Sequence, residues 1–307
     1  MKYSFVLPAY KATFFKEALD SILTQTYKEF ELIIVNDASP EDLDSIVNSY
    51  SDARIRYYKN EKNIGGKDLV AQWNHCLEYA QGDYIILASD DDVYHQEYLE
   101  KMDVLVNKYT EVNVFRPRVQ YIDENGKITG ICGCIADKVS WLEYWYYWGH
   151  VGSSIGHIIF NRTKLIENGG FVNFPMGWGS DDATILMMGK NGICFESEIL
   201  YSFRNSGQNI SSALNSYNSL VKKVEAREKF YILLKKNLNE CQADTALERY
   251  YRNVSIENIN NIFQSITVHL ISQTSFISAL RVLPQLINIE YIKPLVALKR
   301  IFMNIYK

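Results

Sequence analysis

The sequence has little that would place the protein among disulfide-rich, membrane-spanning or nucleic-acid-binding proteins. Its five cysteines are an odd number without a Cys-x-x-Cys pair, so we expect them to be reduced, in a cytoplasmic protein. No apolar run is long enough to cross a bilayer, and Met1-Lys2 leads directly into an expected strand, so no signal peptide is visible. A formal net charge of −4 gives no electrostatic reason to expect a nucleic-acid partner.

A Gly-x-Gly-x-x-Gly motif is also missing after the first expected strand, which argues against an unrelated dinucleotide enzyme of the Rossmann type. The remaining composition is ordinary for a globular protein, with 47% hydrophobic and 22% charged residues. A chain of 307 residues is long enough for one large domain or two modest ones.

Short apolar runs alternate with amphipathic segments in the first third of the chain. We expect strands at 3–7, 30–35, 54–58 and 82–87, and helices at 14–25, from Pro40 and at 69–80. Such alternation predicts an α/β fold of parallel strands joined by right-handed crossovers. The last polar residues of each strand then meet at one edge of the sheet, where open α/β sheets bind ligands.

Three consecutive carboxylates, Asp90, Asp91 and Asp92, follow the apolar run that ends at Leu87. Adjacent carboxylates repel one another, and a divalent cation such as Mg²⁺ or Mn²⁺ would relieve this repulsion while also binding phosphate oxygens. The alternative is a solvated acidic turn that caps the helix expected from Gln96.

Other polar residues are expected at the same edge of the sheet. Tyr10 can lie against a base, and Asp37 can bind a uracil N–H or a ribose hydroxyl. The loop with Asn63, Gly65 and Gly66 allows close approach of the backbone to a ligand, and Lys67 supplies a positive charge for phosphate. Each also has a structural interpretation: Asp37 as a helix cap, Tyr10 in the core and the glycines in a turn.

The middle of the chain offers weaker signals. We expect a helix at 96–109, a strand at 112–121 and a hairpin turn at 123–126. The aromatic residues from Trp141 to Trp148 could form either a platform for a sugar ring or part of the core, and we favour the core.

Residues Met1 to about Ser212 resemble the inverting family 2 glycosyltransferases, which have the GT-A fold. The resemblance rests on Val6 to Tyr10, on Asn36 to Ser39 and on Asn63 with Gly65. The spacing of Asn74, Ala80 and Gly82 from the acidic motif also matches. It implies a Rossmann-like, mostly parallel central sheet flanked by helices. Its nucleotide-sugar half would be about 1–94 and its acceptor half about 95–212.

The resemblance also implies a donor site and a metal site. The donor would be a nucleotide-diphosphate sugar, a UDP-sugar first of all, and a Mn²⁺ or Mg²⁺ ion would bind the acidic motif. Two registers of the family motif are possible: one makes Asp92 the metal ligand, and the other places Ser89 at the first family acid and makes Asp91 the ligand. The residues implied in contacts with the donor are Pro8, Ala9, Tyr10, Asp37, Asn63, Gly65, Lys67 and Asp90.

A catalytic helix is implied from Gly177 to Gly189, after a strand at 152–161 and a turn at Gly169 to Phe171. An inverting transfer needs a carboxylate that takes the proton from the acceptor hydroxyl. Counting back from Gly192 gives Asp181 as this base, with Asp182 as the alternative, and an N-terminal helix cap is the structural interpretation of both.

One departure from the family concerns the metal. The family commonly has Tyr-Arg-x-His after its last strands, but here the run is Phe203-Arg204-Asn205-Ser206, without the histidine. Either the oxygen of Ser206 or Asn209 replaces it, or the metal depends more on carboxylate, phosphate and water.

Residues 213–307 are expected to form a helical C-terminal extension, with helices at 221–238, 243–270 and 276–306. The last of these is basic, and Leu295, Leu298, Ile301, Phe302 and Ile305 share one of its faces. Such a helix can lie on an anionic membrane or pack on the catalytic domain or a second subunit, which would form a homodimer.

The sequence therefore predicts a metal-dependent inverting glycosyltransferase that extends a surface polysaccharide or glycolipid, at the inner face of the plasma membrane. The alternative is a non-catalytic member that binds a nucleotide sugar or acts as a scaffold, which Ser89 and Ser206 would favour.

Overall fold

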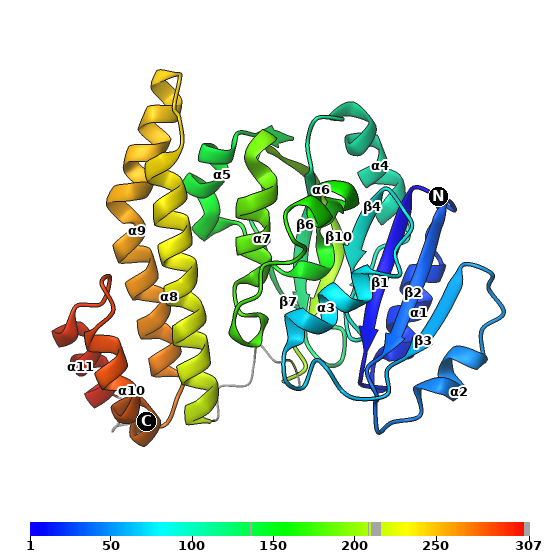
Figure 1. Cartoon of the computed structure of the whole chain (residues 1–307), viewed down its shortest axis with the longest axis horizontal. Coiled ribbons are helices and arrows are strands. Elements are labelled where there is room, and N and C mark those ends of the chain that lie inside the picture. The colour runs from blue at the N-terminus through cyan, green and yellow to red at the C-terminus, as the bar shows by residue number, and fades with distance from the viewer. Residues whose placement is uncertain (136, 208, 210–215, 304–307) are drawn as a thin grey trace. The chain divides into compact units, whose positions relative to one another are not determined.

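The computed structural model describes residues 1–135, 137–207, 209 and 216–303. The chain packs into two compact units (Figure 1). The first unit consists of Met1–Asn173 and Ser180–Ser206, and the second of Phe174–Gly179 and Gly207–Lys307. The domain boundary proposed near residue 212 lies outside the described residues.

Four parallel strands form one half of the sheet in the first unit. They are β1 (Tyr3–Ala9), β2 (Phe30–Asn36), β3 (Ile55–Lys59) and β4 (Tyr84–Leu87), in the order β3-β2-β1-β4. Ala9 lies opposite Asn36, and Val6 lies opposite Leu87. The carboxyl ends of these strands therefore meet, as predicted, and deliver Tyr10, Asp37 and the acidic motif to one edge.

The other half of the sheet is mixed. β9 (Ile159–Asn161) runs antiparallel between β4 and β6 (Val114–Ile122), and β6 is parallel to β10 (Ile193–Arg204). β5 (Val93–Tyr94) and β8 (Lys138–Val139) pair antiparallel with β10. The strand expected at 152–161 is thus mostly wrong, because residues Ile155–His157 form a 3-10 turn and pairing begins only at Ile159.

The hairpin turn between β6 and β7 (Ile128–Ile131) is confirmed. The backbone N–H of Gly126 donates to the carbonyl of Asp123 at 3.1 Å, and Gly126 has a φ of 80°. The Asp123 carboxylate accepts the N–H groups of Asn125 and Lys127, each at 2.9 Å. Because these hydrogen bonds join residues close together in the sequence, the turn could be predicted from the sequence alone.

The helices of the first unit largely follow the predicted amphipathic segments. A correction concerns α2, which begins at Leu43 rather than at Pro40 because the Asp42 side chain accepts the N–H of Ser45 and caps it. The others begin and end near the expected residues, and α5, α6 and short 3-10 turns complete the unit. The helices are α1 (Phe15–Leu23), α2 (Leu43–Asn48), α3 (Leu69–Leu77), α4 (Tyr98–Lys108), α5 (Trp141–Tyr147), α6 (Arg162–Glu167) and α7 (Ser180–Met188), and the turns are Trp148–His150, Ile155–His157 and Gly189–Asn191.

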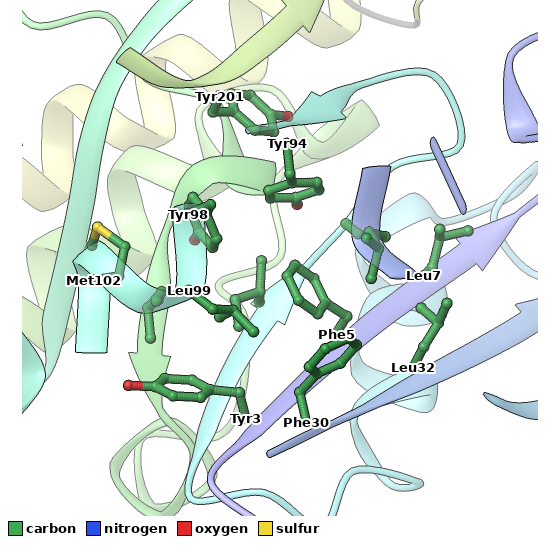
Figure 2. Packing of buried hydrophobic residues seen from close by; sticks show 14 of the residues in the cluster. Tyr3, Phe5, Leu7, Phe30, Leu32, Tyr94, Tyr98, Leu99, Met102 and Tyr201 are labelled. Carbon is green, nitrogen blue, oxygen red and sulfur yellow. The ribbon is translucent and has the colours of Figure 1, made fainter. Parts of the chain in front are cut away.

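An aromatic cluster in the core includes Tyr94, which follows the acidic motif in the sequence (Figure 2). The ring of Tyr94 packs edge-to-face on Phe5 at 5.0 Å, on Tyr98 at 5.0 Å and on Tyr201 at 5.1 Å. Such pairs contribute about 0.5–1.5 kcal/mol each beyond burial. Tyr94 follows the acidic motif by two residues, so this packing fixes the backbone that carries the acids.

The second unit is helical. Its helices are α8 (Tyr217–Glu240), α9 (Ala246–Ser272), α10 (Phe276–Ile287) and α11 (Pro294–Met303), and a 3-10 turn spans Pro175–Gly177. α8 and α9 run side by side (Figure 1), joined by a core that includes Phe230, Tyr231 and Phe263. The single helix expected at 276–306 is wrong: residues 288–293 interrupt it, and Ile289, Tyr291 and Ile292 are buried there. Ile305 lies outside the described residues.

Among the described helices, none combines the length and the hydropathy that a membrane-spanning segment requires.

Candidate active site

Asp90 joins the ends of β1 and β4. Its carboxylate accepts the backbone N–H groups of Tyr10 and Lys11, both at 2.8 Å. Burial raises the pKa of Asp90, and these two hydrogen bonds oppose the shift. Asp90 therefore holds the segment with Tyr10, which is 40% exposed, beside the acidic motif.

Asp92 is held entirely by the protein. One carboxylate oxygen accepts the hydroxyls of Ser89 and Tyr201, and the other accepts the backbone N–H of Arg204 at 2.7 Å. Burial raises the pKa of this carboxyl, while the three hydrogen bonds favour its charged form. Both oxygens of Asp92 thus take part in contacts that fix its position.

Asp91 differs from its neighbours. Burial, together with the charges of Asp92 and Asp90, raises its pKa to about 7. A divalent cation beside this carboxyl would relieve the repulsion and hold it ionised. Which of Asp91 and Asp92 is the metal ligand stays a prediction. Within the described residues, no group of three or more His, Cys, Asp and Glu side chains is arranged as a metal site, so phosphate and water would have to complete the ligands.

Arg204 is a residue whose importance the sequence did not reveal. It is buried at the end of β10, and its Nε donates to the backbone carbonyl of Asp91 at 2.8 Å. Its guanidinium also pairs with Glu17 at 2.6 Å and lies 4.3 Å from the ring centre of Phe14. Arg204 thereby links the acidic motif to the segment that follows β1.

Asp37 organises the neighbouring loop. Its carboxylate accepts the side-chain amide of Asn60 at 2.8 Å and the backbone N–H groups of Ile64 and Gly65 at 2.8 and 2.7 Å. A Cβ on Gly65 would lie only 3.0 Å from the carboxylate of Asp37, so glycine is needed for this approach. Because these contacts all lie within the protein, a direct contact of Asp37 with a ligand stays a prediction.

The rest of this loop lies at the same edge. Asn63 accepts the backbone N–H of Gly66, and a Cβ on Gly66 would come within 2.7 Å of its side-chain oxygen. Lys67 follows and is exposed, as a phosphate-binding lysine would have to be. Pro8 and Ala9 end β1 beside this region.

Asp181 and Asp182 lie in the first turn of α7. Asp182 is buried, and its carboxylate accepts the indole N–H of Trp148 at 2.9 Å. Asp181 is half-buried, and its carboxylate accepts the backbone N–H of Asp182 at 2.9 Å. The first turn of a helix favours negative charge. Asp181 is thus the more accessible acid, in agreement with the spacing from Gly192.

The stretch Gly152–Gly156 contacts two tyrosines, Tyr201 and Tyr121, that lie near the two acid clusters. On one side, a Cβ on Gly156 would overlap the hydroxyl of Tyr201, the donor to Asp92. On the other side, a Cβ on Gly152 would overlap the hydroxyl of Tyr121. Burial raises the pKa of Tyr121, its hydrogen bond with Cys132 raises it further, and the charge of Asp181 makes a smaller contribution. Both clusters therefore lie at the carboxyl ends of β4, β6 and β10.

The direction of α7 agrees with this placement. α7 continues through Gly189–Asn191 into the amino end of β10, so its own first turn lies toward the end where Arg204 is found. A helix that leads into a parallel strand presents its N-terminus at the carboxyl edge of the sheet.

The aromatic segment is confirmed as core. Trp141, Tyr144 and Trp145 are buried, although Trp148 also contributes its N–H to Asp182. Arg116, which the sequence did not assign, is buried nearby and donates to the hydroxyl of Tyr144 at 3.0 Å.

The two residues that could replace the missing histidine, Ser206 and Asn209, belong to different units. Ser206 lies two residues after β10 in the first unit, and Asn209 belongs to the second. A role of either in metal binding stays a prediction.

Comparison with known families identifies the fold and the family. The model described as Glycosyl transferase family 2 matches residues 4–175, more than half of the chain. The chain belongs to glycosyl transferase family 2. The matched region contains both β1 and the acidic motif, and it ends before α7.

Relatives in this family cover shorter regions. Uncharacterized glycosyltransferases of Rickettsia bellii and Methanocaldococcus jannaschii are each 34% identical, over 128 and 118 residues. These matches cover 40% and 38% of this chain and 18% and 40% of the relatives. The chain thus spans less than half of the length of either relative.

A solved structure extends the likeness to the whole chain. S. aureus TarS 1–349, in complex with UDP-GlcNAc, gives a TM-score of 0.58 at 18% identity and covers 99% of this chain and 89% of that chain. At this identity the likeness shows the fold alone. The family 2 protein thus has a GT-A-like fold with a helical C-terminal region.

Proposed function

We propose that this family 2 member is a metal-dependent inverting glycosyltransferase that moves a sugar from a UDP-sugar to a hydroxyl of a growing surface polysaccharide or glycolipid. The observation that carries the proposal is that two acid clusters, Asp90–Asp92 after β4 and Asp181–Asp182 at the start of the helix that leads into β10, lie at the same edge of the sheet. A transfer reaction needs one acidic group for the leaving diphosphate and another for the attacking hydroxyl.

Asp91 is proposed to hold the Mn²⁺ or Mg²⁺ ion. When bound, the ion would neutralise the charge that develops on the departing diphosphate. Asp92 would keep Asp91 in place through its hydrogen bonds to Tyr201 and Arg204. Asp90 would keep Tyr10 in place in the same way.

The donor is proposed to lie along the ends of β1 and β2. Tyr10 would lie against the base, and Lys67 would approach the phosphates. Asp37 would either contact the nucleotide or hold the loop of Asn63 and Gly65 that does so. The binding of UDP-GlcNAc by TarS, a protein of similar fold, supports a UDP-sugar as the donor class.

Asp181 is proposed to be the base, since it is the more accessible of the two acids of α7. It would take the proton of the acceptor hydroxyl as the oxygen attacks the anomeric carbon. Asp182, fixed by Trp148, would hold the first turn of the helix in position.

The alternative is a non-catalytic protein that binds a nucleotide sugar, for which Ser89 and Ser206 were the sequence evidence. The structure gives Ser89 a positioning role, because its hydroxyl donates to Asp92. This contact weakens the case that Ser89 marks a lost activity.

Donor hydrolysis tests the proposal. With Mn²⁺ present, we expect slow release of UDP from a UDP-sugar, and we expect Asp91→Asn to abolish it. Asp83→Asn, at the exposed opposite end of β4, serves as the matched control and should keep the activity. If no UDP-sugar raises the melting temperature in the presence of Mn²⁺ and none is hydrolysed, the donor assignment is wrong.

The proposed location is the inner face of the plasma membrane, on the cytoplasmic side. Five cysteines outside any disulfide and a basic C-terminal region support it. A homodimer is the competing proposal for the C-terminal helices, and light scattering would test it.

A further inference from the structure

The last two helices of the second unit form a hairpin. The ring of Phe276, at the start of α10, lies 6.3 Å from that of Phe302, near the end of α11, so the two helices run antiparallel. Ala279, Val282 and Leu286 of α10 are buried, and so are Ala297 and Ile301 of α11. The hairpin therefore already uses one apolar face of each helix for packing.

Each helix also has a second apolar face, which is exposed. On α10 this face consists of Ile277, Leu280, Pro284 and Ile287, at spacings of three, four and three residues. On α11 it includes Leu295 and Phe302, seven residues apart. Ile277 is 69% exposed and Leu295 is 81% exposed, so these are not residues at the rim of a core. Large apolar patches on a soluble surface mark interaction sites.

The charge of the hairpin is opposite to that of the remaining chain. Arg281, Lys293, Lys299 and Arg300 stand against Glu290 alone in residues 276–303, which gives the hairpin a net charge of +3. Since the whole chain carries −4, the other residues carry −7. Glu290 is moreover ion-paired with Lys235 of α8.

We propose that the hairpin of α10 and α11 is a docking surface for an anionic lipid membrane. The exposed apolar side chains would enter the boundary between headgroups and acyl chains, and the exposed Lys293 and Lys299 would lie among the anionic headgroups. The guanidinium of Arg281 instead packs on the ring of Tyr217 of α8. The remaining chain, with its net charge of −7, would be repelled by the same anionic surface.

The same charges argue against a second copy of the chain as the occupant. Two hairpins brought face to face would each carry +3 into one contact, and like charges oppose such an association. The sequence predicted a single membrane-facing surface on the final helix that included Ile301. Because Ile301 is buried, the proposed membrane-facing surface instead consists of the exposed faces of α10 and α11.

Sedimentation of the intact protein with vesicles tests the proposal. Vesicles of phosphatidylcholine with about one third phosphatidylglycerol should bind it, and pure phosphatidylcholine vesicles should bind it more weakly, with the difference lost at high salt. The triple variant Ile277→Ser, Leu295→Ser, Phe302→Ser should bind anionic vesicles at least about tenfold more weakly. Lys293→Gln with Lys299→Gln should weaken binding by about fivefold for each charge removed.

A matched triple variant controls for general loss of surface hydrophobicity. Val104→Ser, Ile128→Ser and Ile166→Ser change exposed apolar residues of the first unit and should leave vesicle binding unchanged. UDP release in the absence of vesicles should be the same for all variants, which separates this proposal from the proposed reaction. The proposal is overturned if the intact chain does not sediment with anionic vesicles. It is also overturned if the hairpin triple variant sediments as fully as the intact chain, or if it alters only the particle mass in light scattering.

Discussion

The two acid clusters of the first unit are built alike. In each, one acid is buried and receives a hydrogen bond from an aromatic side chain: Asp92 from Tyr201 and Asp182 from Trp148. In each, the acid one position earlier, Asp91 or Asp181, is the one that we propose to act on the metal or on the acceptor. The comparison suggests a division of roles, in which the aromatic-bound acid holds the backbone and its neighbour meets the substrate.

The clusters differ in the charge around them. Asp91 lies between two other carboxylates, and its pKa is raised to about 7 by burial and by those charges. Asp181 lies at the N-terminus of α7, where the helix dipole favours an ionised acid. The first environment suits a cation, and the second suits a base that must be deprotonated before it acts.

The largest expected effect is that of Asp91→Asn. Release of UDP with Mn²⁺ should fall by at least about a hundredfold, because metal stabilisation of the leaving group contributes several kcal/mol. The melting temperature should stay the same or rise, since one of three repelling charges is removed. If Asp91→Asn stays active while Asp92→Asn is folded but inactive, then Asp92 is the metal ligand and Asp91 is not.

Asp181→Asn should have the next largest effect. We expect transfer to water or sugar to fall by about 10² to 10⁴, the range for loss of a general base, with the donor affinity unchanged. Asp182→Asn should cost far less, because an amide oxygen can still accept the N–H of Trp148. Measuring UDP release and donor binding for both variants distinguishes loss of the base from loss of the fold. If the two variants lose the same amount of activity, the different roles proposed for Asp181 and Asp182 are wrong.

Tyr201→Phe removes the hydroxyl that donates to Asp92. The free energy of unfolding should decrease by about 1–3 kcal/mol, as for a buried hydrogen bond to a charged group. Denaturant unfolding would measure this decrease. The hydrogen bond from the backbone N–H of Arg204 to the same carboxylate should remain in the variant. Tyr98→Phe, which loses a hydroxyl bonded to the carbonyl of His157, is the matched control for a bond to a neutral group. A cost no greater than that of the control would mean that Asp92 does not depend on Tyr201.

A smaller, pH-dependent effect is expected at Glu31, a buried acid whose carboxylate is ion-paired with Arg56 at 2.7 Å. Burial raises its pKa, but hydrogen bonds from Ser4, Arg56 and the N–H of Gln81 outweigh this, and the net pKa is lowered. The resulting stability is therefore fully present above the unfolded value of about 4.3 and is lost as pH falls through the lowered pKa. Unfolding of Glu31→Gln should differ from the intact protein by about 1–2 kcal/mol at pH 7. This difference in the free energy of unfolding should shrink toward pH 3. A difference that does not change with pH would contradict the prediction.

The sequence was sufficient where the interactions are local. β1 to β4 and most helices follow from apolar spacing and nearby caps, as for Asp68, which accepts the N–H of Ala71 at the start of α3. β9 was misplaced because a strand of three residues between β4 and β6 is specified by its neighbours and not by its own pattern.

The contacts that distinguish Asp91 from Asp92 could not be predicted from the sequence, because they too join residues far apart in the chain. They involve Tyr201 and Arg204, which lie 109 and 112 residues away from Asp92. The need for glycine at 152 and 156 comes from side chains distant in sequence: Tyr121 and Cys132 at Gly152, and Tyr201 at Gly156. Both features are long-range contacts, which periodicity cannot report.

The dependence of Asp92 on β10 has a consequence for how the protein is made. Two of the three donors to its carboxylate belong to a strand that leaves the ribosome long after the acidic motif. A nascent chain that has not yet emerged as far as Tyr201 lacks the groups that order the motif. The capacity to capture a donor should therefore arise late in synthesis, when the strand that completes the sheet has been added.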